Sequence, residues 1–229
     1  MKYLSDFIAL FYPRYCDVCG RVLVKGEEFL CTYCIANLPK TNFHLHKDNP
    51  VEMVFAGRVP VFRATAFCSF RKGNSMQAII HQLKYKDNKG IGIYLGKLLG
   101  KALIEEPDFN SVDVIIPIPL HKQKKKKRGY NQSEYIAKGI ALSMSKQVNT
   151  SSLTRIIDTS TQTRKNRYKR WENVSSIFQL NNEDELSGKH ILLVDDVITT
   201  GSTMEAAAQL LTKLPNTKVS VACLGYTAD

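Results

Sequence analysis

The chain has 229 residues, of which 44% are hydrophobic and 23% are charged. This balance excludes a disordered chain and fits one ordinary domain with a small appendage. Lysine and arginine outnumber aspartate and glutamate by 32 to 21, and the net charge of +11 favours polyanionic partners such as a phosphorylated substrate or nucleic acid. No apolar segment reaches membrane-spanning length, so we expect no membrane span.

The N-terminal residues are predicted to pack on the rest of the protein. Met1–Tyr15 contains Asp6 and is followed by no small-residue cleavage site, so we expect no signal peptide and a cytoplasmic location. Apolar residues between Leu4 and Phe11 recur at helical spacing. This pattern predicts a short helix packed on the rest of the chain.

Two cysteine pairs follow, Cys16-x-x-Cys19 and Cys31-x-x-Cys34, and the eleven residues between them suit a small β-hairpin. Four thiolates form the donor set of a closed, structural Zn²⁺ site, which leaves no ligand position open for catalysis. The alternative is two disulfides or unligated thiols, but disulfides are rare in the cytoplasm. The spacing therefore predicts a zinc-ribbon-like module.

The mixed polar stretch Pro39–Pro60 is predicted to be a linker. Since four cysteines already satisfy zinc, His44 and His46 are interpreted as solvated loop residues. We therefore expect two domains. Residues 1–60 would hold the N-terminal helix, the zinc module and the linker, and residues 61–229 would form the main domain.

The main domain is predicted to begin with the strand Val61–Phe70, followed by helices over Ala78–Tyr85 and Gly90–Leu103 and a buried strand over Val112–Pro119. Lys84 lies in the last turn of the first of these helices. It either faces a phosphate or is a solvated helix end, and the sequence favours neither.

A basic loop is expected over Leu120–Tyr130, and a helix from about Asn131. Lys124–Lys127 repel one another unless solvent or an anion compensates, so the simplest interpretation is a solvated loop. We favour a pyrophosphate cradle, because Arg128 offers two directed donors and Gly129 permits close backbone approach at a strand end.

Further along the chain, Leu153–Ile157 and Lys218–Gly225 are predicted strands. Thr161–Trp171 is dense in cations and too polar for a core, so it is either a flap that closes over a polyanion or a basic surface loop. Cys68 and Cys223 lie within apolar runs and are expected to be buried core thiols.

The stretch His190–Thr203 organises the chain. Its apolar run, Ile191–Val194, suits a strand covered on both faces of a parallel sheet. Ser202 and Glu205 have capping-box spacing, so a helix is expected to begin near Ser202 and to stop before Pro215.

Two acids and a turn lie between that strand and that helix. Backbone N–H groups of the turn and of the helix start can bind a phosphate, and Gly201 lets the backbone approach it closely. Asp195 and Asp196 can accept hydrogen bonds from sugar hydroxyls. The alternative is a buried strand with an acidic end and a capped helix.

This stretch resembles the signature of type I phosphoribosyltransferases, an apolar strand followed by two acids and T-T-G-x-T. The resemblance implies that the two acids hold ribose hydroxyls of phosphoribosyl pyrophosphate and that the loop holds the 5-phosphate. The residues assigned to this ligand, by the resemblance or by the cation arguments above, are Lys84, Arg128, Gly129, Asp195, Asp196, Val197, Thr199, Thr200, Gly201, Ser202 and Thr203.

The whole order of motifs resembles the ComF family of competence proteins. The motifs are the four-cysteine module, Lys84-Tyr85-Lys86, Pro117-Ile118-Pro119-Leu120, Arg128-Gly129-Tyr130-Asn131-Gln132, Gln162 with Arg170, Asn173-Val174, and the phosphoribosyl loop. Tyr130 stands where the family often has phenylalanine. The resemblance implies an α/β, type I phosphoribosyltransferase-like parallel sheet flanked by helices, a zinc module, and a role in uptake of single-stranded DNA.

As an enzyme, such a chain would bind phosphoribosyl pyrophosphate with Mg²⁺, which neutralises charge on the departing pyrophosphate. Arg128 and the flap cations Arg164, Lys165 and Arg167 would offset the same charge. Asp195 and Asp196 would orient the ribose and favour positive charge at C1. The acceptor that then adds at C1 is not indicated.

Two other functions remain open. In the first, the chain is a non-catalytic module that binds single-stranded DNA or a DNA-uptake helicase, with Tyr130, Tyr168 and Trp171 stacking on bases. In the second, it is a nucleotide salvage enzyme, for which the sequence shows no base-recognition pocket.

Overall fold

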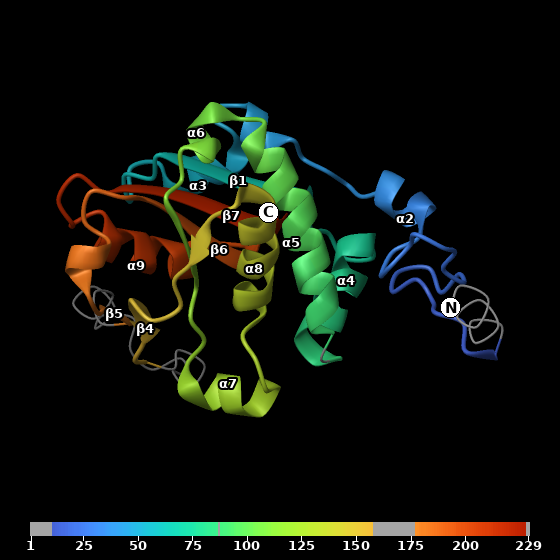
Figure 1. Ribbon diagram of the computed structural model, residues 1–229. Coiled ribbons are helices and arrows are strands. Elements are labelled where there is room, and N and C mark those ends of the chain that lie inside the picture. The colour runs from blue at the N-terminus through green and yellow to red at the C-terminus, as the bar shows by residue number, and fades with distance from the viewer. Residues whose placement is uncertain (1–10, 87, 158–176, 228–229) are drawn as a thin grey trace.

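The computed structural model describes residues 11–86, 88–157 and 177–227. Its centre is a five-stranded sheet in the order β1-β7-β6-β2-β3, and every pairing is parallel (Figure 1). The strands are β1 (Arg63–Ser69), β2 (Val114–Pro117), β3 (Gln147–Val148), β6 (His190–Ile198) and β7 (Lys218–Tyr226). The predicted parallel α/β sheet is confirmed, with the motif-bearing strand β6 at its centre.

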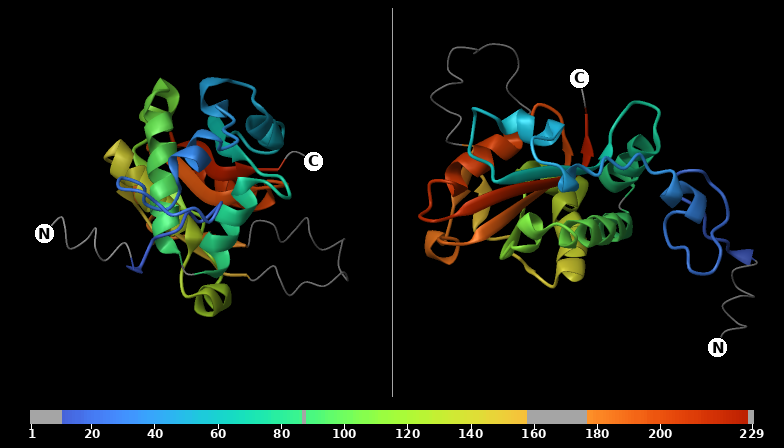
Figure 2. Two further views of the ribbon diagram at one scale, coloured as in Figure 1. Left: turned by 90° about the vertical axis from the view of Figure 1, so that its right-hand side faces the viewer. Right: turned by 90° about the horizontal axis from the view of Figure 1, so that it is seen from above.

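Helices cover both faces of this sheet. Successive residues of a strand point to opposite faces, and accordingly Leu192 packs with one core while Ile191 and Leu193 pack with the other. Figure 2 shows the sheet between the two helical layers. One layer contains α4 (Ser75–Tyr85), α5 (Lys89–Ile104) and α8 (Gln132–Met144), and the other contains α3 (Pro50–Phe55) and α9 (Ser202–Leu211).

Glycines bring α5 and α8 into close contact. A Cβ atom at Gly96 would overlap the carbonyl oxygen of Ile136, and one at Gly139 would overlap the carbonyl oxygen of Ile93. The two helices therefore pack backbone to backbone, and this fixes the first turn of α8 beside the end of β2. Cys68 and Cys223 are fully buried in the two cores, as expected.

The predicted linker belongs to the folded body, and that interpretation was wrong. Thr41 donates its N–H to Phe67 O at 3.1 Å, so this stretch adds to the edge of β1. Val51 and Phe55 of α3 are buried in the core, and His44 is buried rather than solvated. Helix α3 has only six residues, so its apolar residues are too few to show a helical period in the sequence. A division into folding units at residue 60 remains a prediction.

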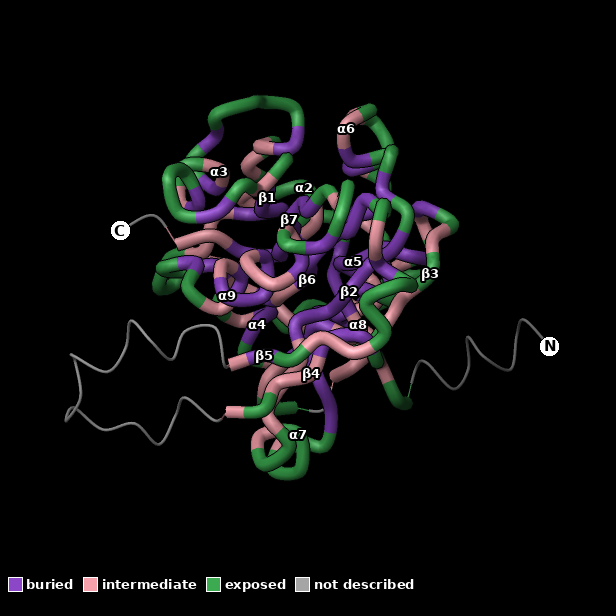
Figure 3. The backbone as a smooth tube through the Cα atoms, turned by 90° about the vertical axis from the view of Figure 1, so that its left-hand side faces the viewer, coloured by how far each residue is buried: buried purple, intermediate pink, exposed green. Residues whose placement is uncertain are grey.

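The basic segment after β2 also differs from the expected loop, because it forms α7 (Lys122–Arg128). Lysine, glutamine and arginine are good helix formers, and Gly129 ends the helix in the left-handed region at φ 85°. Each residue of α7 is exposed or intermediate in burial, as the green and pink colours of Figure 3 show. The cations are therefore held on a projecting helix and not spread along a flexible loop.

Shorter elements complete the description. β4 (Leu153–Arg155) and β5 (Phe178–Leu180) form an antiparallel pair apart from the main sheet. The remaining short elements are α2 (Thr32–Ala36), α6 (Pro107–Asn110), η1 (Phe43–Leu45) and η5 (Glu183–Glu185). Among the residues that the structure describes, no helix combines the length and apolarity needed to cross a bilayer.

The cysteine module lies at one end of the molecule, beside α4 and α5 (Figure 1). In place of the expected hairpin between the cysteine pairs, the described part of the module shows one antiparallel bridge, Tyr15 to Val22, which spans the first pair. Asn88 donates to Asp17 at 2.9 Å, and the Phe29 and Tyr94 rings lie 5.8 Å apart. The N-terminal helix predicted over residues 4–11 lies almost wholly outside the described residues.

Candidate functional site

Asp195 and Asp196, the acidic pair, lie near the carboxyl end of β6, where Asp195 is in register with Cys223 of β7. Asp195 accepts hydrogen bonds from Ser133 Oγ at 2.7 Å and from the Asp196 amide at 2.8 Å. Burial and the neighbouring Asp196 carboxylate raise the pKa of Asp195 to about 7, against the opposing effect of those hydrogen bonds. Hydroxyl donors or cations beside the two carboxylates would therefore stabilise their charged form.

Asp196 already has one cationic partner. Lys84 Nζ, from the last turn of α4, lies 2.8 Å from Asp196 Oδ2, and their side chains are 26% and 11% exposed. Lys84 is thus neither a solvated helix end nor distant from the acids. Its contact with a phosphate remains a prediction, but the structure brings it into the candidate site.

The loop after β6 opens α9. Gly201, at φ 72°, is the N-cap residue, and Ser202 is the first residue of the helix. The expected capping box is absent from this helix, because Ser202 Oγ pairs with Thr200 Oγ1 at 3.0 Å and Glu205 forms an ion pair with Arg58. Thr199, Thr200 and Ser202 are exposed. The helix start, with its N–H groups and hydroxyls, is therefore accessible to an anion.

Arg128 lies at the end of α7 and points back toward α8. Its Nη1 donates to Gln132 Oε1 at 2.6 Å, and its guanidinium carbon lies 6.0 Å from the centre of the exposed Tyr85 ring. Gln132 precedes Ser133, the residue that contacts Asp195. Lys84 therefore contacts the acidic pair directly, whereas Arg128 is linked to it only through Gln132, the neighbour of Ser133.

The flap cations Arg164, Lys165 and Arg167 lie outside the described residues. So do the other residues of Thr161–Trp171, which the sequence interpreted as a flap or a basic loop. The segment that contains them joins β4 to β5.

Sequence reasoning missed Ser133 and Arg58, and it named Gln132 only as part of a motif. Ser133 directly follows the quoted R-G-Y-N-Q motif, and its place in the first turn of α8 was a usable signal. Gln132 is 1% exposed, and within the described chain its Nε2 has no hydrogen-bond partner. Arg58 contacts the loop from the predicted linker, and no local pattern marks it.

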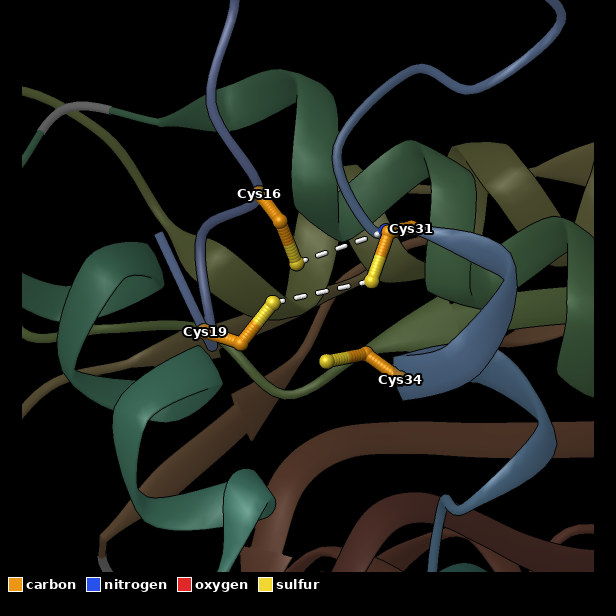
Figure 4. A group of neighbouring side chains, drawn as sticks. All are labelled: Cys16, Cys19, Cys31 and Cys34. Carbon is orange, nitrogen blue, oxygen red and sulfur yellow. Dashed lines mark hydrogen bonds between the residues drawn. The ribbon is translucent and has the colours of Figure 1, made fainter. Parts of the chain in front are cut away.

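The four cysteines converge on one point (Figure 4). Their sulfur atoms all lie within 4.8 Å of one another, and Cys19 Sγ and Cys31 Sγ are 3.6 Å apart. Bonded disulfide sulfurs are about 2.0 Å apart, whereas a zinc tetrahedron with bonds of about 2.3 Å has sulfur–sulfur edges of about 3.8 Å. The cluster therefore fits a four-coordinate metal and not two disulfides.

Thiol electrostatics agree with a metal site. Burial opposes ionisation of Cys16, but backbone N–H groups of Cys19 and Cys31 favour the thiolate and lower the pKa of Cys16 to about 7. Burial and the neighbouring thiols raise the pKa of Cys34. The Cys16 thiol therefore ionises readily, whereas the Cys34 thiol does not. A bound cation would favour the thiolate form of both.

Comparison with known proteins agrees with this geometry. Residues 133–228 match the family described as "Phosphoribosyl transferase domain". The DNA utilization protein YhgH of Escherichia coli O157:H7 is 30% identical over 223 residues, covering 96% of this chain and 93% of that protein. Competence protein F of Haemophilus influenzae is 28% identical over 150 residues, covering 64% of this chain and 66% of that protein.

The chain belongs to the ComF family of phosphoribosyltransferase-like proteins. The match at residues 133–228 begins at Ser133 and includes β6, the acidic pair and α9. A solved structure titled as the allosteric regulatory enzyme of purine biosynthesis is 20% identical, with a TM-score of 0.42, covering 62% of this chain and 29% of that one.

Proposed function

We propose that this chain binds phosphoribosyl pyrophosphate together with Mg²⁺ at the carboxyl end of β6. One observation carries the proposal. Two carboxylates lie near the carboxyl end of the central strand, which ends at Ile198, and the turn that follows, with Thr199 and Thr200 exposed, opens a ten-residue helix. Membership of a phosphoribosyltransferase-like family supports the same ligand.

Each group in the site has a distinct role in this proposal. Asp195 and Asp196 accept hydrogen bonds from the ribose hydroxyls, and Lys84 exchanges its contact with Asp196 for one with the ligand. N–H groups at the start of α9, with the hydroxyls of Thr199, Thr200, Ser202 and Thr203, hold the 5-phosphate. Val197 lies between the acids and this loop.

The pyrophosphate end is assigned to Arg128 and Gly129. When bound, Mg²⁺ supplies positive charge that neutralises the pyrophosphate. Arg128 adds a directed donor, and Arg164, Lys165 and Arg167 are proposed to add further charge. An acceptor nucleophile would bond to C1 as the C1–O bond to pyrophosphate breaks, with the electron pair leaving on the pyrophosphate oxygen.

We assign Zn²⁺ to the four-cysteine cluster in a structural role, because all four donors are used. We also place the protein in DNA uptake, since its relatives are named for DNA utilization and competence. Single-stranded DNA and a DNA-uptake helicase are the proposed partners. The exposed cations of α7 beside the exposed Tyr85 ring suit a polyanion that also carries bases.

Calorimetric titration with phosphoribosyl pyrophosphate and Mg²⁺ tests the binding site. The parent should bind, and Asp195→Asn with Asp196→Asn should lose binding while unfolding at a similar temperature. The control variant, Glu183→Gln with Asp184→Asn, changes two exposed acids of η5 and should bind like the parent. A double Asp195/Asp196 variant that binds as tightly as the parent contradicts the ribose assignment.

Turnover requires a second measurement, a screen of acceptors for pyrophosphate release. Release with any acceptor supports an enzyme. Tight binding without release across the screen favours the non-catalytic module, in which the phosphate site senses a ligand.

A further inference from the structure

We infer that Arg58 is a positioning residue for the phosphate loop 199–203: it aims a backbone N–H of that loop at the ligand and neutralises the Glu205 carboxylate in the first turn of α9. The inference rests on the proposed function. Arg58 lies in the stretch that the sequence suggested was a linker, and 142 residues separate it from the loop.

One guanidinium joins three elements at this point. Arg58 Nη1 donates to Val54 O at 2.9 Å and to Thr200 O at 3.0 Å. Its Nη2 forms an ion pair with Glu205 Oε2 in the first turn of α9. Arg58 therefore ties the end of α3 both to the loop and to the helix that the loop opens.

The support behind Arg58 is rigid. Asn49 caps α3 by accepting N–H donors from Val51 and Glu52, and Phe55 is 1% exposed. Gly201 packs directly on this helix, because a Cβ at that position would overlap Val54 Cγ1. The loop thus rests on a capped, buried helix and has little freedom to follow the ligand by itself.

Holding the Thr200 carbonyl fixes a donor on the other side of the same peptide unit. In a trans peptide the carbonyl of one residue and the N–H of the next point in opposite directions. Within the described residues all peptide bonds are trans. Because Arg58 binds Thr200 O, the Gly201 N–H is turned away from α3 and is presented to an anion at the start of α9.

Arg58 also acts through charge. Glu205 is the fourth residue of α9 and is the acidic residue of its first turn. A carboxylate so close to a phosphate site would repel the phosphate, and the side chain is only 16% exposed, so solvent screens it poorly. Arg58 pairs with this carboxylate and so removes the repulsion.

These two actions predict a particular pattern in a double-mutant cycle, measured by calorimetry with phosphoribosyl pyrophosphate and Mg²⁺. Arg58→Ala should weaken binding about tenfold, a typical size for breaking one member of a coupled network. Glu205→Gln alone should bind within about twofold of the parent. Adding Glu205→Gln to Arg58→Ala should restore part of the lost affinity, because the unpaired negative charge is gone.

Lys47→Ala is the matched control. Lys47 lies on the same stretch of chain and its ammonium is 3.6 Å from Asp108 Oδ2, but that ion pair lies away from the loop. This variant should bind like the parent. Hydrogen exchange without ligand gives a second readout, since amides of residues 199–203 should exchange faster in Arg58→Ala and not in Lys47→Ala.

The outcomes separate the inference from the function on which it rests. If the parent does not bind, the proposed function fails and the inference fails with it. If the parent binds and Arg58→Ala binds equally well, only the inference is overturned. A loss in Arg58→Ala that Glu205→Gln fails to relieve overturns the charge argument. Should Arg58→Ala unfold, Arg58→Lys carries the test, because it keeps the charge but lacks the forked donors.

Discussion

The cysteine module and the sheet domain are stabilised in different ways. Around the four cysteines the buried apolar side chains are few, chiefly Leu23, Leu30 and Leu38, while Tyr12 and Val24 are more than half exposed. The sheet is buried on both faces by two apolar cores, and the module's leucines belong to one of them. A unit with so few buried apolar side chains of its own needs a metal, whereas the sheet does not. Loss of the metal should therefore unfold the module and leave the sheet domain folded.

The largest expected effect comes from Cys31→Ser. Structural zinc contributes on the order of 10 kcal/mol of apparent folding free energy to small modules, so three ligands should hold the metal poorly. Elemental analysis should fall from one zinc per chain to well below one, and hydrogen exchange should rise in residues 11–38 only. Cys68→Ala, which removes a buried thiol of the sheet, should keep the zinc. Full zinc content in Cys31→Ser would show that the cysteines are not the metal site.

Gly96→Ala should damage the sheet domain instead. Its added methyl group would overlap the carbonyl oxygen of Ile136, and overpacking of this kind costs about 3 kcal/mol. Urea denaturation should show the loss while zinc content stays at one per chain. Lys101→Ala, on the exposed side of the same helix, should change stability by less than about 0.5 kcal/mol. Equal stability of the two variants would mean that α5 and α8 separate easily.

Asp195 should make the sheet less stable as pH rises. Its pKa is raised from the ordinary 3.8 to about 7, so the folded state holds the proton more tightly than the unfolded state does. Stability should fall between about pH 4 and pH 7, by on the order of 4 kcal/mol. Asp195→Asn removes the titrating group, so urea denaturation at pH 5 and pH 8 should show a smaller difference than in the parent. Asp184→Asn, on the surface, should keep the parent's difference.

The smallest effect on stability is expected for α7. Changing Lys124–Lys127 to glutamine should alter stability by less than about 0.5 kcal/mol, since these side chains are at least partly exposed. Affinity for single-stranded DNA should fall and its salt dependence should flatten, by roughly 0.7 in log K per phosphate contact for each unit of log salt. Fluorescence anisotropy across a salt series measures both.

Arg128→Ala should do the reverse and weaken phosphoribosyl pyrophosphate with little effect on DNA. If the four-lysine variant loses the small ligand as completely as Arg128→Ala, the division into two polyanion sites is wrong. All of α7 would then serve the pyrophosphate.

Features with a local physical cause could be predicted from the sequence. The run Ile191–Val194 predicted a strand buried on both faces, since only such a strand tolerates continuous apolar residues. Two C-x-x-C pairs predicted a metal cluster, since the short spacing already brings each pair of thiols together. The capping-box spacing of Ser202 and Glu205 before an alanine-rich segment predicted the start of α9, although the capping box itself is absent.

The distant groups that complete the site could be found only from the folded chain. Ser133 reaches Asp195 across 62 residues, Lys84 reaches Asp196 from another helix, and Arg58 reaches Thr200 across 142 residues. No periodicity or spacing encodes such pairs, because they depend on the order β1-β7-β6-β2-β3 and on the close packing of α5 against α8. The supposed linker was misread for the same reason: a short helix shows its buried face only when the sheet it covers is present.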